Sequence, residues 1–158
     1  MSLATLTDSL PSTAKADTAV LQYAAMPYSI VEDRVAFLLI TSRRTGRWIF
    51  PKGSLIDGLS PAGSAAQEAY EEAGVRGTID TTPIGSYRTI KQRLRRTPVH
   101  VQIFPLLVTE QLDIWPEMEQ RRRHWVLLTE AKRLLSDNGA IDLATKLNAR
   151  VRESVERR

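Results

Sequence analysis

The 158-residue chain contains no cysteine, so its sequence excludes disulfide bonds, thiolate metal sites and cysteine nucleophiles. It also lacks any apolar run approaching the ~18 residues that a membrane-spanning helix needs. The opening stretch MSLATLTDSLPSTAKADTAV has no basic start followed by a continuous apolar core, which disfavours a secretory signal. These absences favour a cytoplasmic protein that makes no contact with a membrane.

The residues that are present have an ordinary globular composition, with 42% hydrophobic and 25% charged side chains. Because the length suits one core, we predict a flexible tail over residues 1–18 and a single domain over residues 19–158. The net charge of +4 is unevenly spread, since cations gather between Arg88 and Arg96 and again at Arg121–Arg123. Such clusters indicate an anionic partner.

Strands and helices are expected to alternate irregularly along this domain. Short apolar runs with β-branched and aromatic members predict strands within residues 20–28, 34–41, 78–90, 98–109 and 122–128. Capping residues and helical spacing predict helices from Ser60-Pro61 to Gly74, from a Thr129 cap to about Leu135, and over Ile141–Val155. The pattern favours an α+β class, an α/β/α sandwich with a mixed sheet between helices.

The first of these helices combines a stripe of small side chains with a cluster of acids near its end. Its alanines permit close approach to a sheet, while Glu68, Glu71 and Glu72 lie beside that stripe. Each like-charged pair costs roughly 0.2–0.5 kcal/mol, and anions at this end oppose the helix dipole by ~0.3–1 kcal/mol. No Lys or Arg inside the helix offsets this cost, so the acids form either a solvated face or a cation site. Oxygen ligands without cysteine favour Mg²⁺ or Mn²⁺ over zinc.

The stretch GSLIDGLSPAGSAAQEAYEEAGV, which includes this helix, resembles the Nudix box. That motif is a Gly, five residues, a Glu, seven residues, then Arg-Glu-aliphatic-any-Glu-Glu-any-Gly-aliphatic. The matching positions are Gly53, Glu68, Ala69, Glu71, Glu72, Gly74 and Val75. The segments RWIFPKG, GSYR, IFPL and WPE are similar to the diphosphoinositol polyphosphate phosphohydrolase branch of the family.

The resemblance implies a Nudix-like mixed β-sheet flanked by helices and a metal-dependent hydrolase. Its expected reaction is attack of water on a diphosphate linkage in a nucleoside or inositol polyphosphate. Inositol pyrophosphates and dinucleoside polyphosphates are the favoured substrates.

Two positions depart from the motif, since Leu59 replaces its first Glu and Gln67 replaces its Arg. That Arg normally helps to orient the neighbouring catalytic Glu. Removing one member of a charge pair strands the other, whereas losing both can be nearly neutral. The joint absence is therefore compatible with an intact fold.

The resemblance also implies roles for individual residues. Glu68, Glu72 and the main-chain carbonyl of Lys52 would bind Mg²⁺ or Mn²⁺, and Glu71 would accept the proton and could contact the metal. A distant acid sometimes takes the role of base in this family, so Glu117 and Glu119 are further candidates, although solvated loop acids are commoner.

Basic residues are the expected ligands of the phosphate groups. Arg43 matches a phosphate-contacting position of the resembling branch, and Arg47 and Lys52 lie close to it in the sequence. A guanidinium can donate to two phosphate oxygens at once. Further candidates are Arg88, Lys91 and Arg93, which would attract a small polyanionic substrate.

Two other functions remain open at this point. The basic stripe would permit removal of diphosphate from an RNA 5′ end, but no RNA motif with interleaved aromatic residues supports a nucleic-acid partner. Alternatively, Leu59 and Gln67 would suit a module that binds a phosphorylated ligand without cleaving it. Retention of the three glutamates argues against that reading.

Overall fold

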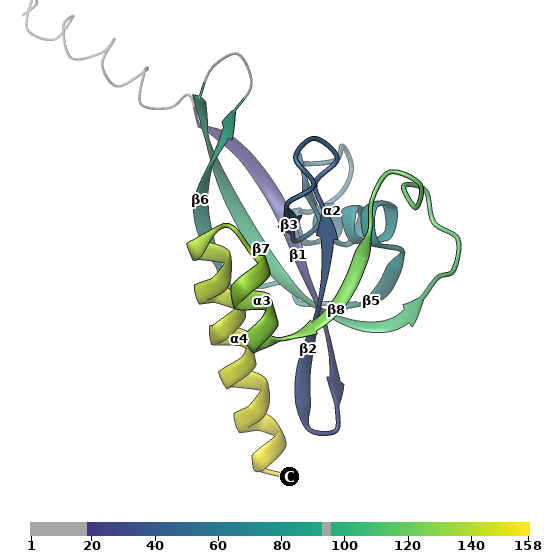
Figure 1. Ribbon diagram of the computed structural model, residues 1–158, viewed down its shortest axis with the longest axis vertical. Coiled ribbons are helices and arrows are strands. Elements are labelled where there is room, and N and C mark those ends of the chain that lie inside the picture. Colours follow the sequence, from purple (N-terminus) through teal and green to yellow (C-terminus); the bar gives the residue numbers. More distant parts are fainter. Residues whose placement is uncertain (1–18, 93–95) are drawn as a thin grey trace, which may run out of the picture.

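A computed structural model of the protein describes residues 19–92 and 96–158 (Figure 1). The predicted tail and Arg93 lie outside these described residues. The strands are β1 (Val20–Val31), β2 (Arg34–Thr41), β3 (Trp48–Ile49), β4 (Lys52–Gly53), β5 (Val75–Ile79), β6 (Gly85–Gln92), β7 (Arg96–Gln111) and β8 (Arg123–Leu127). The helices are α2 (Pro61–Glu68), the π-helical turn η1 (Ala69–Ala73), α3 (Leu128–Leu134) and α4 (Asn138–Glu156).

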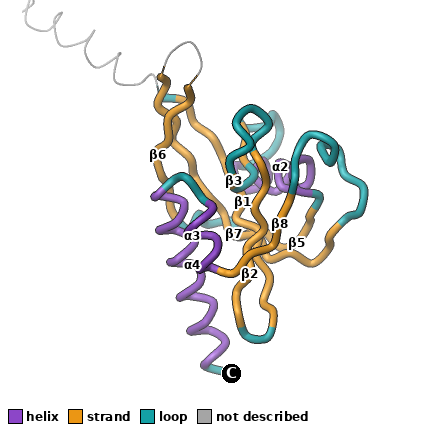
Figure 2. The backbone as a smooth tube through the Cα atoms, in the orientation of Figure 1, coloured by secondary structure: helices purple, strands orange, loops and turns teal. Residues whose placement is uncertain are grey.

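The strands form one mixed sheet, which confirms the predicted α+β class (Figure 2). The main strand order is β3-β2-β1-β7-β5, and β4, β6 and β8 pair with β1, β7 and β2 respectively. Strand β1 pairs with β7 in parallel, whereas the other pairings are antiparallel. Strand β7 is long enough to pair with β6 along its first part and with β5 along its second.

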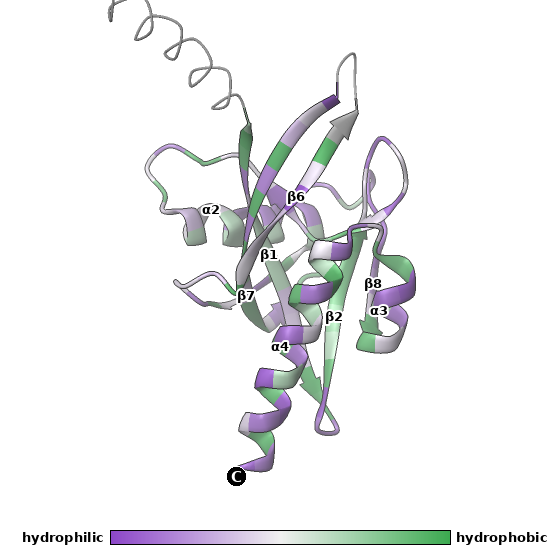
Figure 3. Cartoon of the chain, turned by 90° about the vertical axis from the view of Figure 1, so that its left-hand side faces the viewer, coloured by the Kyte–Doolittle hydropathy of each residue, from purple (hydrophilic) through white to green (hydrophobic). Residues whose placement is uncertain are grey.

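Helices cover both faces of this sheet, and the side chains of successive residues in each strand point to opposite faces. In β2, Phe37 and Leu39 point toward α3 and α4, while Leu38 and Ile40 point toward α2. Figure 1 and Figure 3 show α3 and α4 on one side of the strands and α2 on the other. The molecule therefore has two cores separated by the sheet.

The two cores differ in the size of their side chains. The large-side-chain core, under α3 and α4, includes Met26, Phe37, Leu39, Phe50, Ile103 and Leu147. The alanine-rich core, under α2 and η1, consists of Ala25, Leu38, Ile40, Ala62, Ala65, Ala69, Ala73, Val75, Phe104 and Leu106. Small helical side chains allow α2 and η1 to approach the sheet closely, as the alanine stripe predicted.

The caps of the first helix agree with the sequence prediction. The Ser60 hydroxyl accepts a hydrogen bond of 3.0 Å from the Gly63 amide, and Pro61 occupies the first helical position. Gly74 ends the helix in the left-handed conformation, with φ of 67°. The regular α-helix stops at Glu68, however, and a π turn completes the segment.

The later helices begin elsewhere than predicted. Helix α3 starts at Leu128 directly after β8, and its N-cap Leu127 makes no side-chain capping bond. The predicted cap at Thr129 is wrong, because that residue already lies inside the first turn. Helix α4 covers the predicted 141–155 segment and starts earlier, at Asn138. In residues 19–92 and 96–158, no helix is long and apolar enough to cross a membrane.

Candidate active site

The acidic pair Glu68 and Glu72 lies where α2 passes into η1, next to the short strand β4. The Glu72 side chain is buried, and its Oε1 accepts a hydrogen bond of 3.1 Å from the Lys52 amide. Glu68 is half-buried, and a hydrogen bond joins its side chain to that of Glu72. Helix and β4 therefore bring two carboxyl groups together against the main chain of Lys52.

Gly53 leaves the space that Glu68 occupies. A Cβ atom at position 53 would lie 2.5 Å from the Glu68 carboxyl carbon and from Oε1. This contact places the Glu68 carboxyl group directly on the backbone of β4. Glycine is needed here for close approach rather than for an unusual backbone angle.

Burial of these two acids opposes their ionisation. Burial raises the pKa of Glu72 to about 8, and the charges of Glu68 and Glu117 act in the same direction. The Arg121 guanidinium and the Lys52 amide partly offset this shift. Burial also raises the pKa of Glu68, with Glu71 as the next cause. The surroundings therefore disfavour full ionisation of the pair unless a further cation binds.

The loop between β7 and β8 docks on the end of this helix. Four carbonyl groups at the end of a helix have no partner within it, and here the loop supplies donors to them. Leu112 N donates to Gly74 O (2.8 Å), Trp115 Nε1 to Glu72 O (3.2 Å), Glu117 N to Glu71 O (3.0 Å) and an Arg123 guanidinium nitrogen to Ala73 O (3.0 Å).

Arg123 also brings a positive charge to the negative end of the helix dipole. Its guanidinium carbon lies 3.8 Å from the centre of the Trp115 ring, and Gly74 leaves room for both side chains. The helix ending in acids is thus stabilised by donors from a segment distant in sequence.

Arg121 connects the same loop to the acidic pair. One of its terminal nitrogens lies 3.1 Å from Glu72 Oε2, and its Nε lies 2.9 Å from Glu117 Oε1. The other terminal nitrogen donates to the carbonyl of Thr41 (3.1 Å). Glu117 is therefore an ion-paired residue 21% exposed, not a solvated loop acid.

The donor set suits a hard divalent cation. A hydrogen bond between two carboxyl groups needs one shared proton, and a cation can occupy the position of that proton. Among the described residues, no group of three or more His, Asp or Glu side chains is arranged to hold a metal ion. Mg²⁺, however, is usually bound by one or two carboxylates together with substrate phosphates. The pair Glu68 and Glu72 fits that mode of binding.

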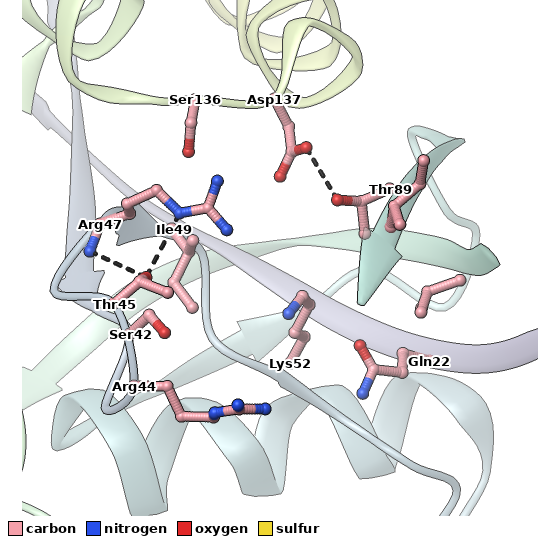
Figure 4. A pocket seen from close by; sticks show the side chains of 12 residues that line it. Gln22, Ser42, Arg44, Thr45, Arg47, Ile49, Lys52, Thr89, Ser136 and Asp137 are labelled. Carbon is pink, nitrogen blue, oxygen red and sulfur yellow. Dashed lines mark hydrogen bonds between the residues drawn. The ribbon is translucent and has the colours of Figure 1, made fainter. Parts of the chain in front are cut away.

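A cavity of about 430 Å³ is lined in part by Lys52, the residue whose amide binds Glu72 (Figure 4). Arg44, Arg47 and Lys52 contribute positive charge to its wall. Ser136 and Asp137 line it from the chain segment before α4, and the Asp137 carboxylate accepts a 2.9 Å hydrogen bond from the Thr89 hydroxyl. The cavity thus has a cationic side and a side rich in hydroxyl and carboxyl groups.

The residues predicted to bind phosphate fall in different places. Arg47 and Lys52 line the cavity, whereas Arg43 is absent from its lining and lies 3.0 Å from Gln120 Oε1 and 3.9 Å from Glu117 Oε1. Arg88 lies on β6 opposite His100 and lines a separate cavity of about 230 Å³. Lys91 belongs to β6, but its side chain, like Arg93, is outside the described part of the chain.

Sequence reasoning missed three features of the site. It did not select Arg44, which lines the cavity, nor Asp137, nor the contact between Arg121 and Glu72. The run Arg121–Arg123 was recognised only as a cationic cluster. Arg121 follows Glu117 by four residues, and this spacing is the one local sequence signal of an ion pair between them.

Comparison with known sequences gives a family match over most of the chain. The model of the NUDIX domain family matches residues 22–147. Nudix hydrolase 17, mitochondrial, of Arabidopsis thaliana is 36% identical over 107 residues, which are 68% of this chain and 58% of that protein. Human diphosphoinositol polyphosphate phosphohydrolase 3-beta is 37% identical over 106 residues, 66% of this chain and 61% of that protein. The chain thus spans less than two thirds of each relative's length.

Comparison with solved structures gives the same fold. A Caenorhabditis elegans Ap4A hydrolase in a binary complex matches with a TM-score of 0.63 and 20% identity, covering 83% of this chain and 96% of that one. The NUDIX domain of Shewanella oneidensis NrtR complexed with ADP ribose matches with a TM-score of 0.64 and 15% identity, covering 84% and 90%.

Proposed function

The chain belongs to the Nudix family, and on that premise we propose that it is a metal-dependent hydrolase that cleaves a diphosphate linkage in a nucleoside or inositol polyphosphate. The observation that carries the proposal is the position of Lys52, which connects the acidic pair to the cationic cavity. Lys52 takes part in both features: its main-chain amide donates a hydrogen bond to Glu72, and the same residue lines the cavity. A phosphorylated ligand bound in the cavity would therefore contact the residue whose amide holds Glu72.

Each group has a role that follows from its chemistry. Glu68 and Glu72, with the Lys52 carbonyl, would hold Mg²⁺ or Mn²⁺. When bound, such an ion lowers the pKa of a water molecule and offsets charge on the phosphoryl oxygens. Glu71 would accept the proton of the attacking water, and Arg44 and Arg47 would bind phosphate oxygens.

The lining of the cavity favours inositol pyrophosphates over dinucleoside polyphosphates. Three of its side chains are cationic, and among the described residues that line it none is aromatic. A nucleobase is typically recognised by stacking on an aromatic ring, whereas a ligand rich in phosphate needs mainly charge. The name of the human relative, a diphosphoinositol polyphosphate phosphohydrolase, supports the same substrate class.

A cytosolic location stays a prediction, since relatives from Arabidopsis thaliana are named mitochondrial or chloroplastic.

Glu72→Gln tests the proposed reaction. We expect loss of Mg²⁺-dependent phosphate release, measured by phosphorus NMR on an inositol pyrophosphate and a dinucleoside tetraphosphate in ¹⁸O-labelled water. Glu71→Gln should lower turnover by roughly 10²–10⁴-fold. The matched control is Glu110→Gln, because Glu110 is 55% exposed and forms a surface ion pair with Arg76.

Circular dichroism would show that each variant is folded. If Glu72→Gln released phosphate as fast as the unmodified protein, the hydrolase proposal would be eliminated. Binding of the inositol pyrophosphate without any release would instead identify a non-catalytic phosphate-binding module.

A further inference from the structure

The departure at position 67 leaves the acidic pair without the guanidinium that the Nudix box usually supplies. Gln67 is uncharged, and α2 and η1 together contain no Lys or Arg. The Glu72 side chain is nevertheless only 8% exposed, and a guanidinium nitrogen lies 3.1 Å from its Oε2 atom. The cation belongs to Arg121, which precedes β8.

Arg121 is held by groups from three separate segments. It donates to Glu72 on η1, to Glu117 on the loop and to the main chain of Thr41 at the end of β2. Its side chain is 7% exposed, so water supplies little of its hydrogen bonding. A planar guanidinium can satisfy three acceptors in fixed directions, which an ammonium group cannot do with the same geometry.

We propose that Arg121 is a positioning residue of this active site: it supplies from the loop a guanidinium that orients Glu72, beside a helix whose usual arginine is replaced by Gln67. This inference rests on the proposed hydrolase function. Arg121 fixes the Oε2 atom of Glu72, while the Lys52 amide fixes Oε1. The carboxylate is thereby held at both of its oxygens, and a hydrogen bond joins it to Glu68.

The contacts of the cluster agree with this role. Glu68, Glu71, Glu72 and Glu117 bring four carboxyl groups to this end of the helix, and the Arg121 guanidinium contacts two of them, Glu72 and Glu117. Because α2 and η1 contain no Lys or Arg, the guanidinium at Glu72 comes from outside the helix.

The test compares Arg121→Gln with Arg121→Lys and with the neighbouring control Arg122→Gln. Arg122 is exposed and does not contact the acidic pair in the described residues. Three quantities are measured: the Kd for Mn²⁺ without substrate, by electron paramagnetic resonance; kcat and KM for an inositol pyrophosphate; and the unfolding midpoint in urea.

For Arg121→Gln we expect Mn²⁺ affinity and kcat each to fall roughly 10–100-fold, as is typical when a group that orients a metal ligand is removed. KM should change less than about threefold, because Arg121 holds Glu72 and not the substrate. Arg122→Gln should match the unmodified protein. Arg121→Lys keeps the charge but not the directions of the hydrogen bonds, so we expect it to recover less than half of the loss on a logarithmic scale.

Whether the Mn²⁺ affinity of Arg121→Gln falls or rises distinguishes a positioning role from simple competition between cations. If Arg121 acted only as a competing cation, its removal would tighten Mn²⁺ binding, and that result would overturn the proposal. Unchanged kcat and affinity in Arg121→Gln would overturn it as well. Should Arg121→Gln fail to fold, Arg121→Lys decides alone, and behaviour equal to the unmodified protein would reject the positioning role. Absence of hydrolysis in the unmodified protein would contradict the proposed function instead, while the Mn²⁺ measurement would still test Arg121.

Discussion

The two faces of the sheet have cores of different composition. The core under α3 and α4 contains large apolar side chains from the strands together with Leu147 and Val151 of α4, and no proposed ligand of the metal lies on these helices. Segments α2 and η1 bury alanines, and they carry all three glutamates of the proposed site. Stability and positioning are therefore supplied by different parts of this molecule.

The difference follows from how each helix is attached. Apolar burial stabilises by roughly 25 cal/mol per Å² and is non-directional, since it depends on the area removed from water. The η1 segment buries little area per residue and is instead fixed by directional bonds to its last carbonyl groups. Directional bonds suit a segment whose carboxylates must not move.

The largest expected effect is a loss of stability, and it comes from the face of the sheet that does not carry the proposed site. Leu147→Ala removes a side chain that is 2% exposed in the large-side-chain core. We expect the free energy of unfolding to fall by about 2–5 kcal/mol, measured in urea, with turnover per folded molecule unchanged. Leu21→Ala, at a position 59% exposed, is the control and should stay within about 0.5 kcal/mol. A loss of turnover in folded Leu147→Ala would contradict the separation of the two faces.

The next effect should appear in activity rather than in stability. Gly53→Ala would place a methyl group where the Glu68 carboxyl group lies, so that side chain must shift. A displacement of about 1 Å at a reacting centre can cost ~10²-fold in rate. We therefore expect a fall of that order in kcat, with the urea midpoint nearly unchanged.

Gly63→Ala is the matched control for this substitution. Its added methyl group would meet only side-chain atoms of Ser60 and Leu59. Its turnover should equal that of the unmodified protein. Equal turnover in Gly53→Ala would show that the fit of Glu68 against β4 is not needed.

The smallest effect is expected from weakening the hydrogen bonds that hold the end of η1. Arg123→Gln removes the cation that donates to Ala73 O and to Leu112 O. We expect a loss of about 1–2 kcal/mol in unfolding free energy, together with a lower kcat. Arg152→Gln, on the exposed side of α4, should change neither quantity. A stability loss without any change in kcat would mean that the loop does not help to position η1.

Much of this arrangement could be predicted from the sequence because its signals are local. Ser60-Pro61 and Gly74 determine the ends of the helix through their own capping geometry. The spacing from Gly53 to Glu68 and Glu72 predicted that these residues act together, and the structure brings them into contact.

Other features depend on contacts between distant segments and could not be predicted in this way. Nothing near Arg121 indicates that it meets Glu72, since the docking of the loop decides that contact. The choice between Arg43 and Arg44 depends on how one turn is oriented. Thr129 is a favourable cap by residue type, but β8 continues directly into α3 and places the helix start before it.

The π turn at Ala69–Ala73 has a consequence for changes in chain length. A π-helix contains more residues per turn than an α-helix, so this turn holds a residue that regular helix would not need. Deleting one residue between Glu68 and Glu72 would allow an ordinary α-helix to form, but it would shorten the separation of these two residues from four positions to three. Such a deletion should therefore disrupt the pairing of the two carboxyl groups even though the shortened helix would itself be sound.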